Sequence, residues 1–286
     1  MAVTETAPRL APRLAPRLAI VKLGGSVLTG LAAYQAAASF LKREAGDGAW
    51  RLVAVVSAEY GHTDALAREA SEIAATPDPA ALDLLWSTGE LRSVALLTLA
   101  LTDAGVAATG LNAHEAGLRA SLDRRGPLHP ASSVDGRGLA TDAIELSGLA
   151  LRAALARHAV VVVPGFLATR FQQIVTLGRG GSDLSAVLLA EALGADRCIL
   201  IKDVDGYFTS DPATHTDATP IEVLTYTHAL AMADASCPLV QRQALAAAKR
   251  ANVPLIVRSF TSTGTRVGEP SPARHFPESQ LSSCWH

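Results

Sequence analysis

The run from Thr176 to Ala186, T-L-G-R-G-G-S-D-L-S-A, constrains the fold of this chain more than any other segment. Before it, four valines at 160–163 are followed by Pro-Gly, which is typical of a buried strand. After it, 185–193 is apolar on nearly every side and predicts a buried helix, while 198–201 predicts a second buried strand. This order predicts a parallel βαβ unit, whose ligands lie at the carboxyl ends of the strands.

The glycine loop within this unit has the features of an anion-binding site. Gly180 and Gly181 follow Arg179 and leave their backbone N–H groups accessible, because glycine has no Cβ. The helix that opens through Ser182 and Asp183 adds the positive end of its dipole. We therefore expect the loop, with the guanidinium beside it, to hold an anion.

Strand and helix signals alternate along the rest of the chain. The expected strands are 18–22, 52–57, 104–109, 160–163, 198–201 and 255–259, and the expected helices are 30–43, 80–101, 147–158, 185–193 and 242–251. This alternation predicts an α/β fold, specifically a three-layer αβα sandwich with a mainly parallel sheet.

Composition narrows the class of protein. With 286 residues, 49% hydrophobic content and a formal net charge of −2, the chain can bury one large core or two lobes that share a sheet, and it has no basic excess to attract nucleic acid. Its three cysteines, Cys198, Cys237 and Cys284, are widely spaced, which fits a reducing cytoplasm better than a disulfide framework or a zinc site. We find no secretory segment and no long apolar run, so we expect a cytoplasmic protein without a membrane span.

The two ends of the chain differ from the middle. The first eighteen residues contain A-P-R-L three times, and proline at every fourth position prevents a stable helix. We expect residues 1–17 to form a disordered arm. Residues 263–286 are rich in Ser, Thr, Pro and Gly and are expected to form an irregular tail. One domain, 18–262, lies between them.

Lys22 ends the first expected strand and is followed by Gly24 and Gly25. A lysine beside a glycine turn is suited to neutralising phosphate oxygens during transfer. The lysine precedes the glycines, so this segment is not a Walker loop. An ordinary tight turn with a solvated lysine is the alternative.

Two further polar segments lie near the second expected strand and in the long helix. Ser57 and Thr63 offer hydroxyls to a polar substrate, while a helix cap by Thr63 or Asp64 is the alternative interpretation. Glu90, at the end of the tetrapeptide S-T-G-E, either receives a substrate ammonium or is a surface residue of the helix.

The segment 202–212, K-D-V-D-G-Y-F-T-S-D-P, follows the strand at 198–201. Its acids and aromatic residues suit a base, a ribose and a magnesium ion. Ordinary Asp-Gly and Asp-Pro turns are the alternative.

Taken in order, these segments resemble the amino-acid kinase superfamily, and within it the catalytic domain of the aspartokinases. The resembling segments are 21–26, 55–66, 87–97, 110–118, 161–166, 176–195, 202–212 and 250–257. The resemblance implies one kinase domain at 18–262, in which 18–165 form an acceptor lobe for a carboxylate substrate and 166–262 form a nucleotide lobe for ATP. It also implies a homodimer, formed through the acceptor lobe.

The resemblance further implies a role for individual residues. Lys22 would stabilise the transferring phosphoryl group, and Asp183 would orient that lysine. The residues implied for substrate binding are Ser57, Thr63, Glu90, Arg179 and Ser182, with Glu90 on the ammonium and Arg179 on the α-carboxylate. The residues implied for nucleotide binding are Gly24, Gly25, Lys202, Asp203, Tyr207, Phe208 and Asp211. ATP and Mg²⁺ are the implied cofactors, and no protein ligand to the metal is assigned.

The implied reaction is in-line attack of a carboxylate, by default the side chain of L-aspartate, on the γ-phosphate of ATP to give an acyl phosphate. Two alternatives stay open. One is a kinase for a different small acid in a specialised biosynthetic pathway. The other is a nonenzymatic protein of the same fold that binds a nucleotide or an oxyanion.

The sequence also departs from the aspartokinase pattern. Pro238 stands where a nucleotide-contacting lysine is expected, so Lys202, Arg242 or Lys249 would have to supply that charge. Lys202 itself replaces a usual threonine, and Glu59 and His62 replace small or apolar residues beside the substrate hydroxyls. Few residues follow the last expected strand, so we also expect no regulatory ACT domains.

Overall fold

The computed structural model describes residues 16–120, 144–146, 148–177, 181–234 and 239–269. The strands of its larger sheet are β1 (Arg17–Leu23), β2 (Trp50–Val56), β3 (Ala108–Gly110), β6 (Val160–Pro164), β9 (Arg197–Ile201), β10 (Val223–Leu224), β11 (Leu255–Arg258) and β12 (Thr265–Val267). They lie in the order β10-β12-β11-β9-β1-β2-β6-β3. Every neighbouring pair is parallel except β11 and β12, which confirms the predicted mainly parallel sheet.

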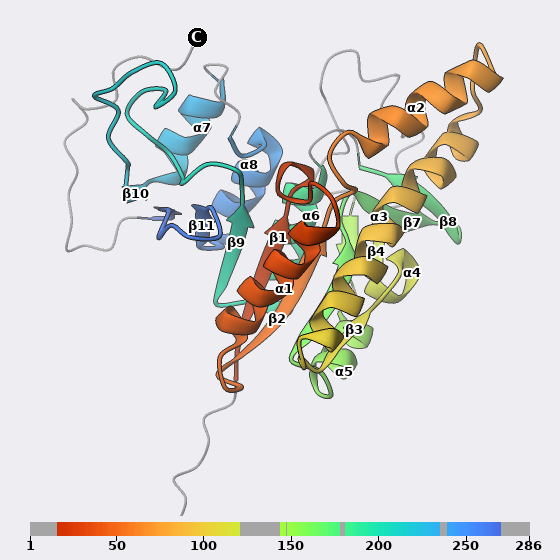
Figure 1. The fold of residues 1–286 in the computed structure, drawn as a ribbon, viewed down its shortest axis with the longest axis horizontal. Coiled ribbons are helices and arrows are strands. Elements are labelled where there is room, and N and C mark those ends of the chain that lie inside the picture. The colour runs from red at the N-terminus through yellow and green to blue at the C-terminus, as the bar shows by residue number, and fades with distance from the viewer. Residues whose placement is uncertain (1–15, 121–143, 147, 178–180, 235–238, 270–286) are drawn as a thin grey trace, which may run out of the picture.

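Helices cover both faces of this sheet, as expected for an αβα sandwich (Figure 1). The helices are α1 (Leu31–Ala45), α2 (His62–Ile73), α3 (Pro79–Asp103), α4 (Ala113–Ala116), α5 (Leu149–Leu155), α6 (Gly181–Leu193), α7 (Tyr226–Asp234) and α8 (Arg242–Ala251), with a short 3₁₀ helix η1 (Gly25–Val27). One core packs α1 and α3 against the sheet. The other core packs α5, α6, α7 and α8 against the opposite face.

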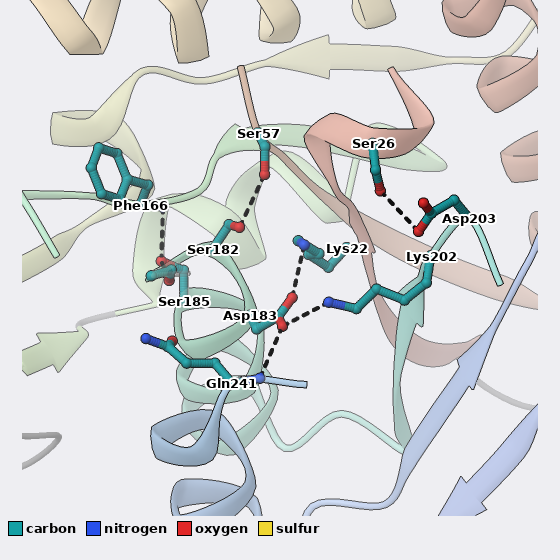
Figure 2. Close-up of polar contacts among 11 residues, drawn as sticks. Lys22, Ser26, Ser57, Phe166, Ser182, Asp183, Ser185, Lys202, Asp203 and Gln241 are labelled. Atoms are coloured by element: carbon teal, nitrogen blue, oxygen red, sulfur yellow. Dashed lines mark hydrogen bonds and ion pairs between the residues drawn. The ribbon is translucent and has the colours of Figure 1, made fainter. Parts of the chain in front are cut away.

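The alternation of side chains along β1 places Lys22 on the α6 face. Successive residues of a strand point to opposite faces of the sheet. Val21 and Leu23 belong to the core with α1 and α3, whereas Ile20 belongs to the core with α6. Lys22 therefore shares its face with Ile20, and its ammonium group reaches the start of α6 (Figure 2).

A second, smaller sheet was not predicted. It consists of β5 (Ile144–Leu146), β4 (Leu118–Ala120), β7 (Leu167–Arg170) and β8 (Gln173–Thr176), in that order. The β7–β8 hairpin turns at Phe171 and Gln172, which have φ angles of 47° and 67°. Both residues of this turn occupy the left-handed region, where Asn and Gly are usual, so the sequence carried no turn signal.

This hairpin alters the predicted path into the glycine loop. The loop follows β8, whereas we expected it to follow the valine strand β6 directly. Strands β6 and β9 are parallel members of one sheet, but β2 and β1 lie between them. The hairpin also pairs with β4, so residues 167–176, which we placed in the nucleotide lobe, share a sheet with a strand of the acceptor lobe.

Two predicted boundaries also change. The tail was expected to be irregular from residue 263, but Thr265–Val267 forms strand β12, which pairs with β11 and β10. The strand expected at 104–109 is shorter and begins later, at Ala108–Gly110. Residues 1–15 and 270–286 lie outside the described part of the chain, so the predicted disordered arm and the end of the tail stay predictions.

Helix α3 is long and apolar enough to cross a membrane, judged by length and composition alone. In this structure it packs against α1, α2 and β8. Its buried residues include Asp83 and Glu90, whose carboxyl groups face the protein interior. These contacts are those of a core helix.

Candidate active site

The candidate site lies at the carboxyl ends of four neighbouring parallel strands. Lys22 is the second-to-last residue of β1, and Ser57, Gly165 and Lys202 directly follow β2, β6 and β9. Carboxyl ends of parallel strands meet at one edge of a sheet, where ligands of open α/β folds bind. Helix α6 begins at Gly181 and brings its amino-terminal residues to the same edge.

Asp183 lies at the centre of the site and binds two lysines (Figure 2). Lys22 Nζ is 2.8 Å from Asp183 Oδ1, and Lys202 Nζ is 2.9 Å from Asp183 Oδ2. The backbone N–H of Gln241 also donates to Oδ2, at 3.4 Å. Asp183 is 3% exposed and Lys22 6%, so this group of charges is almost completely withdrawn from water. We call Lys22, Asp183 and Lys202 the buried triad.

The charges of the triad act on one another. Burial alone would raise the pKa of Asp183, but the ammonium groups of Lys22 and Lys202 outweigh it and hold that pKa well below its usual range. Burial lowers the pKa of Lys202, and the charge of Asp183 only partly offsets this effect. Asp183 is therefore an ionised carboxylate that fixes both lysines in place.

Two glycines allow the strand ends to approach closely. A Cβ on Gly25 would lie 2.9 Å from the carbonyl oxygen of Ala58, so this glycine brings the ends of β1 and β2 together. A Cβ on Gly165 would lie 2.6 Å from Ser182 Cβ, so Gly165 lets β6 contact the start of α6. A Cβ on Gly24 would meet Lys22 Nζ at 2.9 Å, which shows that the ammonium lies over this backbone.

Serine hydroxyls fasten the first turn of α6 to the strand ends. Ser57 Oγ donates to Ser182 Oγ at 3.0 Å. The backbone N–H of Phe166 donates to Ser185 Oγ at 3.2 Å. Figure 2 shows both contacts beside the buried triad. The structure thus brings Ser57 and Ser182 together, as the substrate assignment requires.

A cavity of about 510 Å³ adjoins these serines. Its lining consists of Gly25, Ser57, Ala58, Glu59, Tyr60, Gly61, Thr63, Asp64, Ala67, Trp86, Glu90, Phe166, Gly181 and Ser182. Four of the residues predicted to bind substrate, Ser57, Thr63, Glu90 and Ser182, are among them. The fifth, Arg179, lies outside the described residues, as does most of its loop.

Glu90 is the buried acid of this cavity. Its side chain is on α3, and the residue is 4% exposed. Burial raises its pKa to about 8, although a backbone hydrogen bond from Ala58 and the charge of Lys22 both lower it. One carboxyl oxygen, Oε2, has no hydrogen-bond partner. A buried polar atom without a partner is costly, and a cationic ligand group would supply one.

Three aromatic residues of the cavity were missed from the sequence: Tyr60, Trp86 and Phe166. Trp86 precedes Glu90 by one helical turn on α3, and its indole Nε1 is buried without a hydrogen-bond partner. The spacing of four residues was the available signal, because it places the two side chains on one helix face.

The alternatives left open by the sequence are partly resolved. The N-cap residue of helix α2 is Gly61, which has no side chain to cap the helix. Thr63 and Asp64 are therefore not its N-cap residues. Glu59 forms an ion pair with Arg92 of α3 at the rim of the cavity. Lys22 is buried and paired, which excludes a solvated turn lysine.

The residues predicted to bind nucleotide have different surroundings in the structure. Asp203 accepts a hydrogen bond from Ser26 Oγ at 3.3 Å, near the triad. Tyr207 is 1% exposed and packs in the core with α6, and its backbone N–H donates to Thr265. Phe208 bridges to Pro220, and Asp211 accepts from the backbone of Ala213, which is the turn geometry proposed as the alternative.

The cations proposed to replace the lysine expected at position 238 are separated by the structure. Arg242 forms an ion pair with Asp234 on the surface, and Lys249 Nζ donates to Thr227 Oγ1. Lys202 alone of the three contacts Asp183. Pro238 itself lies outside the described residues. Within the described part of the chain, no group of three or more His, Cys, Asp or Glu side chains could hold a metal ion.

Comparison with known proteins agrees with this geometry. The sequence profile of the Amino acid kinase family matches residues 17–259. The chain belongs to the amino acid kinase family. Among curated family members, Aspartokinase 2 of Bacillus subtilis is 36% identical over 255 residues, which are 88% of this chain and 59% of that protein. Aspartokinase of Thermus thermophilus is 37% identical over 222 residues, 77% of this chain and 51% of that protein.

Solved structures of the family share the fold. Aspartate kinase from Synechocystis matches with a TM-score of 0.74 and 33% identity, over 91% of this chain and 41% of that one. E. coli aspartokinase III in complex with aspartate and ADP matches with a TM-score of 0.71 and 25% identity, over 90% of this chain and 66% of that one. The chain spans little more than half the length of the curated relatives that it matches.

Proposed function

We propose that this protein catalyses the ATP-dependent phosphorylation of a small carboxylate, by default the side chain of L-aspartate, to an acyl phosphate. The observation that carries the proposal is that a positively charged triad adjoins a cavity with a buried acid. The buried triad has two ammonium groups for one carboxylate, and the adjoining cavity contains the buried carboxyl of Glu90. One aspartokinase to which the chain is similar was solved in complex with aspartate and ADP.

In this reaction an oxygen of the acceptor carboxylate attacks the γ-phosphorus of ATP. The bond from that phosphorus to the bridging oxygen breaks, and ADP leaves. Both reactants are anions, so their approach must be compensated by positive charge. Lys22 provides this charge from β1, while Asp183 orients it at 2.8 Å. The start of α6 adds backbone N–H donors and the positive end of the helix dipole.

The acceptor would lie in the cavity between α3 and the strand ends. Glu90 would receive its ammonium, and the hydroxyls of Ser57, Thr63 and Ser182 would contact its oxygens. We retain Arg179 as the partner of the α-carboxylate. Gly24 and Gly25, at the end of β1, are proposed to offer N–H groups to the phosphate chain.

The described residues fit an ATP phosphate chain, because a buried excess of positive charge lies at a helix amino terminus. Mg²⁺ usually binds through substrate phosphates, one or two carboxylates and water. Asp203, held by Ser26 beside the triad, is the carboxylate best placed to approach such an ion. The metal would supply further charge neutralisation on the phosphate oxygens.

A kinase for a different small acid is the second candidate, favoured by the aromatic side of the cavity. Tyr60, Trp86 and Phe166 line it together with the rim pair of Glu59 and Arg92. A cavity of about 510 Å³ also leaves space for an acceptor larger than aspartate. An aromatic or otherwise extended amino acid would use this space while still presenting an ammonium to Glu90.

The test is a panel of acceptors incubated with the protein, Mg²⁺, ATP and hydroxylamine. An acyl phosphate is trapped as a hydroxamate, and ADP release is measured in parallel. Hydroxamate with L-aspartate above the control without acceptor supports aspartokinase activity. Hydroxamate only with another acid supports the second candidate. ATP binding without hydroxamate from any acid would favour the nonenzymatic alternative and overturn the proposal.

We also propose a cytoplasmic homodimer, formed through the acceptor lobe. The support is family resemblance, together with the wide spacing of the cysteines. Sedimentation of the purified chain tests the oligomeric state directly.

A further inference from the structure

We propose that Lys202 is a second catalytic lysine, which acts with Lys22 on the phosphate chain during transfer. The proposal rests on the proposed phosphoryl transfer. It gives Lys202 a part in the transfer itself, whereas the sequence predicted only that Lys202 binds the nucleotide. In this role the end of β9 supplies a cation directly to the reacting groups.

The geometry places the two lysines in equivalent positions. Their ammonium groups bind the two different oxygens of the Asp183 carboxylate, at 2.8 and 2.9 Å (Figure 2). They come from adjacent parallel strands, because β1 pairs with β9 and Lys22 lies opposite Leu200. Lys202 follows that position by two residues, so the two side chains converge on Asp183 from neighbouring strand ends.

The triad carries a positive charge that Asp183 does not compensate. Two ammonium groups face one carboxylate, and the side chains of Lys22, Lys202 and Asp183 are 7%, 13% and 5% exposed. Buried charge is costly unless it is paired. The neighbouring Asp203 is exposed and accepts a hydrogen bond from Ser26. An anion between the two lysines would complete the pairing.

The surrounding groups indicate that this anion is a phosphate. Helix α6 begins at Gly181 and directs the positive end of its dipole to the same place. Ser182, adjacent to Asp183, lines the acceptor cavity and binds Ser57. The triad therefore lies beside the cavity that would hold the attacking carboxylate. A phosphate chain bound at the triad would have its reacting end near that carboxylate.

The other cations considered for this role lie elsewhere. Arg242 and Lys249 are exposed on α8 and bind Asp234 and Thr227. Lys249 is therefore a matched control, since Lys249→Met removes the same charge and leaves the triad untouched. Among the described residues, Lys22 and Lys202 are the two lysines that contact Asp183.

The first experiment measures kcat and both KM values for Lys202→Met, Lys202→Gln and Lys249→Met, with the best acceptor from the panel. Gln retains a hydrogen-bond donor for Asp183 and guards against loss of folding in the Met variant. We expect kcat of both Lys202 variants to fall about 10²–10³-fold, with acceptor KM within about twofold of wild type. Lys249→Met should keep kcat within about twofold. If the Lys202 variants have a raised KM for ATP but an unchanged kcat, Lys202 only binds the nucleotide, and the proposal is overturned.

A second experiment separates direct contact from an effect through Asp183. Calorimetry measures binding of inorganic triphosphate to wild type, Lys202→Gln, Asp183→Asn and the double variant. Direct contact predicts that Lys202→Gln weakens binding at least about tenfold in both backgrounds. If Lys202→Gln weakens triphosphate binding in the protein that retains Asp183 but not in the Asp183→Asn variant, Lys202 is a positioning residue and the proposal is overturned. Because this measurement needs no acceptor, it tests Lys202 even if no carboxylate is phosphorylated.

Discussion

The burial of Glu90 predicts that the protein loses stability as pH rises, in a way that one substitution removes. Burial raises the pKa of Glu90 from 4.5 to about 8 in the folded protein. Between these values the folded protein keeps the proton and the unfolded chain releases it. Each pH unit in this interval therefore lowers the free energy of unfolding by about 1.4 kcal/mol, and the loss ends above about pH 8.

Glu90→Gln is the matching perturbation, because the amide has nearly the same shape and does not titrate. Relative to this variant, the wild type should lose about 1 kcal/mol by pH 5 and about 3 kcal/mol by pH 7. The difference in the free energy of unfolding between the two proteins should thus change by about 2–3 kcal/mol over these two units.

Urea unfolding at pH 5, 6, 7 and 8, followed by tryptophan fluorescence, measures this difference. Glu72→Gln serves as the control for replacing a glutamate by glutamine, since Glu72 is exposed on α2. A change smaller than about 1 kcal/mol between pH 5 and 7 would place the pKa below about 6 and refute the argument. The test is made without ligands, so it does not depend on the proposed reaction.

Substitutions at three further positions test the neighbouring contacts. Lys22→Met should lower kcat about 10²–10³-fold while the Kd for ATP, measured by equilibrium dialysis, changes much less, and a kcat within threefold of wild type would contradict its catalytic role. Gly165→Ala should lower the free energy of unfolding by about 1–3 kcal/mol in urea, because the new Cβ would lie 2.6 Å from Ser182 Cβ; an unchanged midpoint would contradict this. Thr176→Val should cost about 1–3 kcal/mol, because Thr176 Oγ1 donates to the buried Asp83 at 2.7 Å, whereas Thr176→Ser should cost less; equal losses would show that the hydroxyl is not the cause.

The main sheet was predictable from the sequence because its strands are short apolar runs separated by helix signals. The valine run at 160–163 and the apolar 198–201 became β6 and β9. The smaller sheet was not predictable in this way. Its hairpin turns at Phe171 and Gln172, and tertiary contacts hold these residues at positive φ without the usual turn residues. Strand β12 was missed because Thr265–Val267 lies in a segment of turn-like composition.

The sequence predicted those residues of the candidate site that lie within a recognisable local motif. Lys22, Ser57 and Asp183 each lie at a strand end or a helix start, and the structure brings all three together. The position of Lys202 depends on the pairing of β9 with β1, which local sequence does not reveal. Trp86 was missed because, within an apolar helix, only its spacing of four residues from Glu90 distinguishes it from the other apolar side chains.

The buried triad and the cavity at Glu90 each contain a polar group without a full set of partners. The triad holds one ammonium more than its carboxylate can pair, and Glu90 holds a carboxyl oxygen without a partner. An anion at the triad and an ammonium at Glu90 would satisfy both at once. A cation at the triad would meet two lysines, and an acceptor without a hydrogen-bond donor would leave Glu90 Oε2 unpaired. Under the proposed function, these two unsatisfied groups would favour an amino acid as acceptor, and the aromatic side chains of the cavity would decide which amino acid enters.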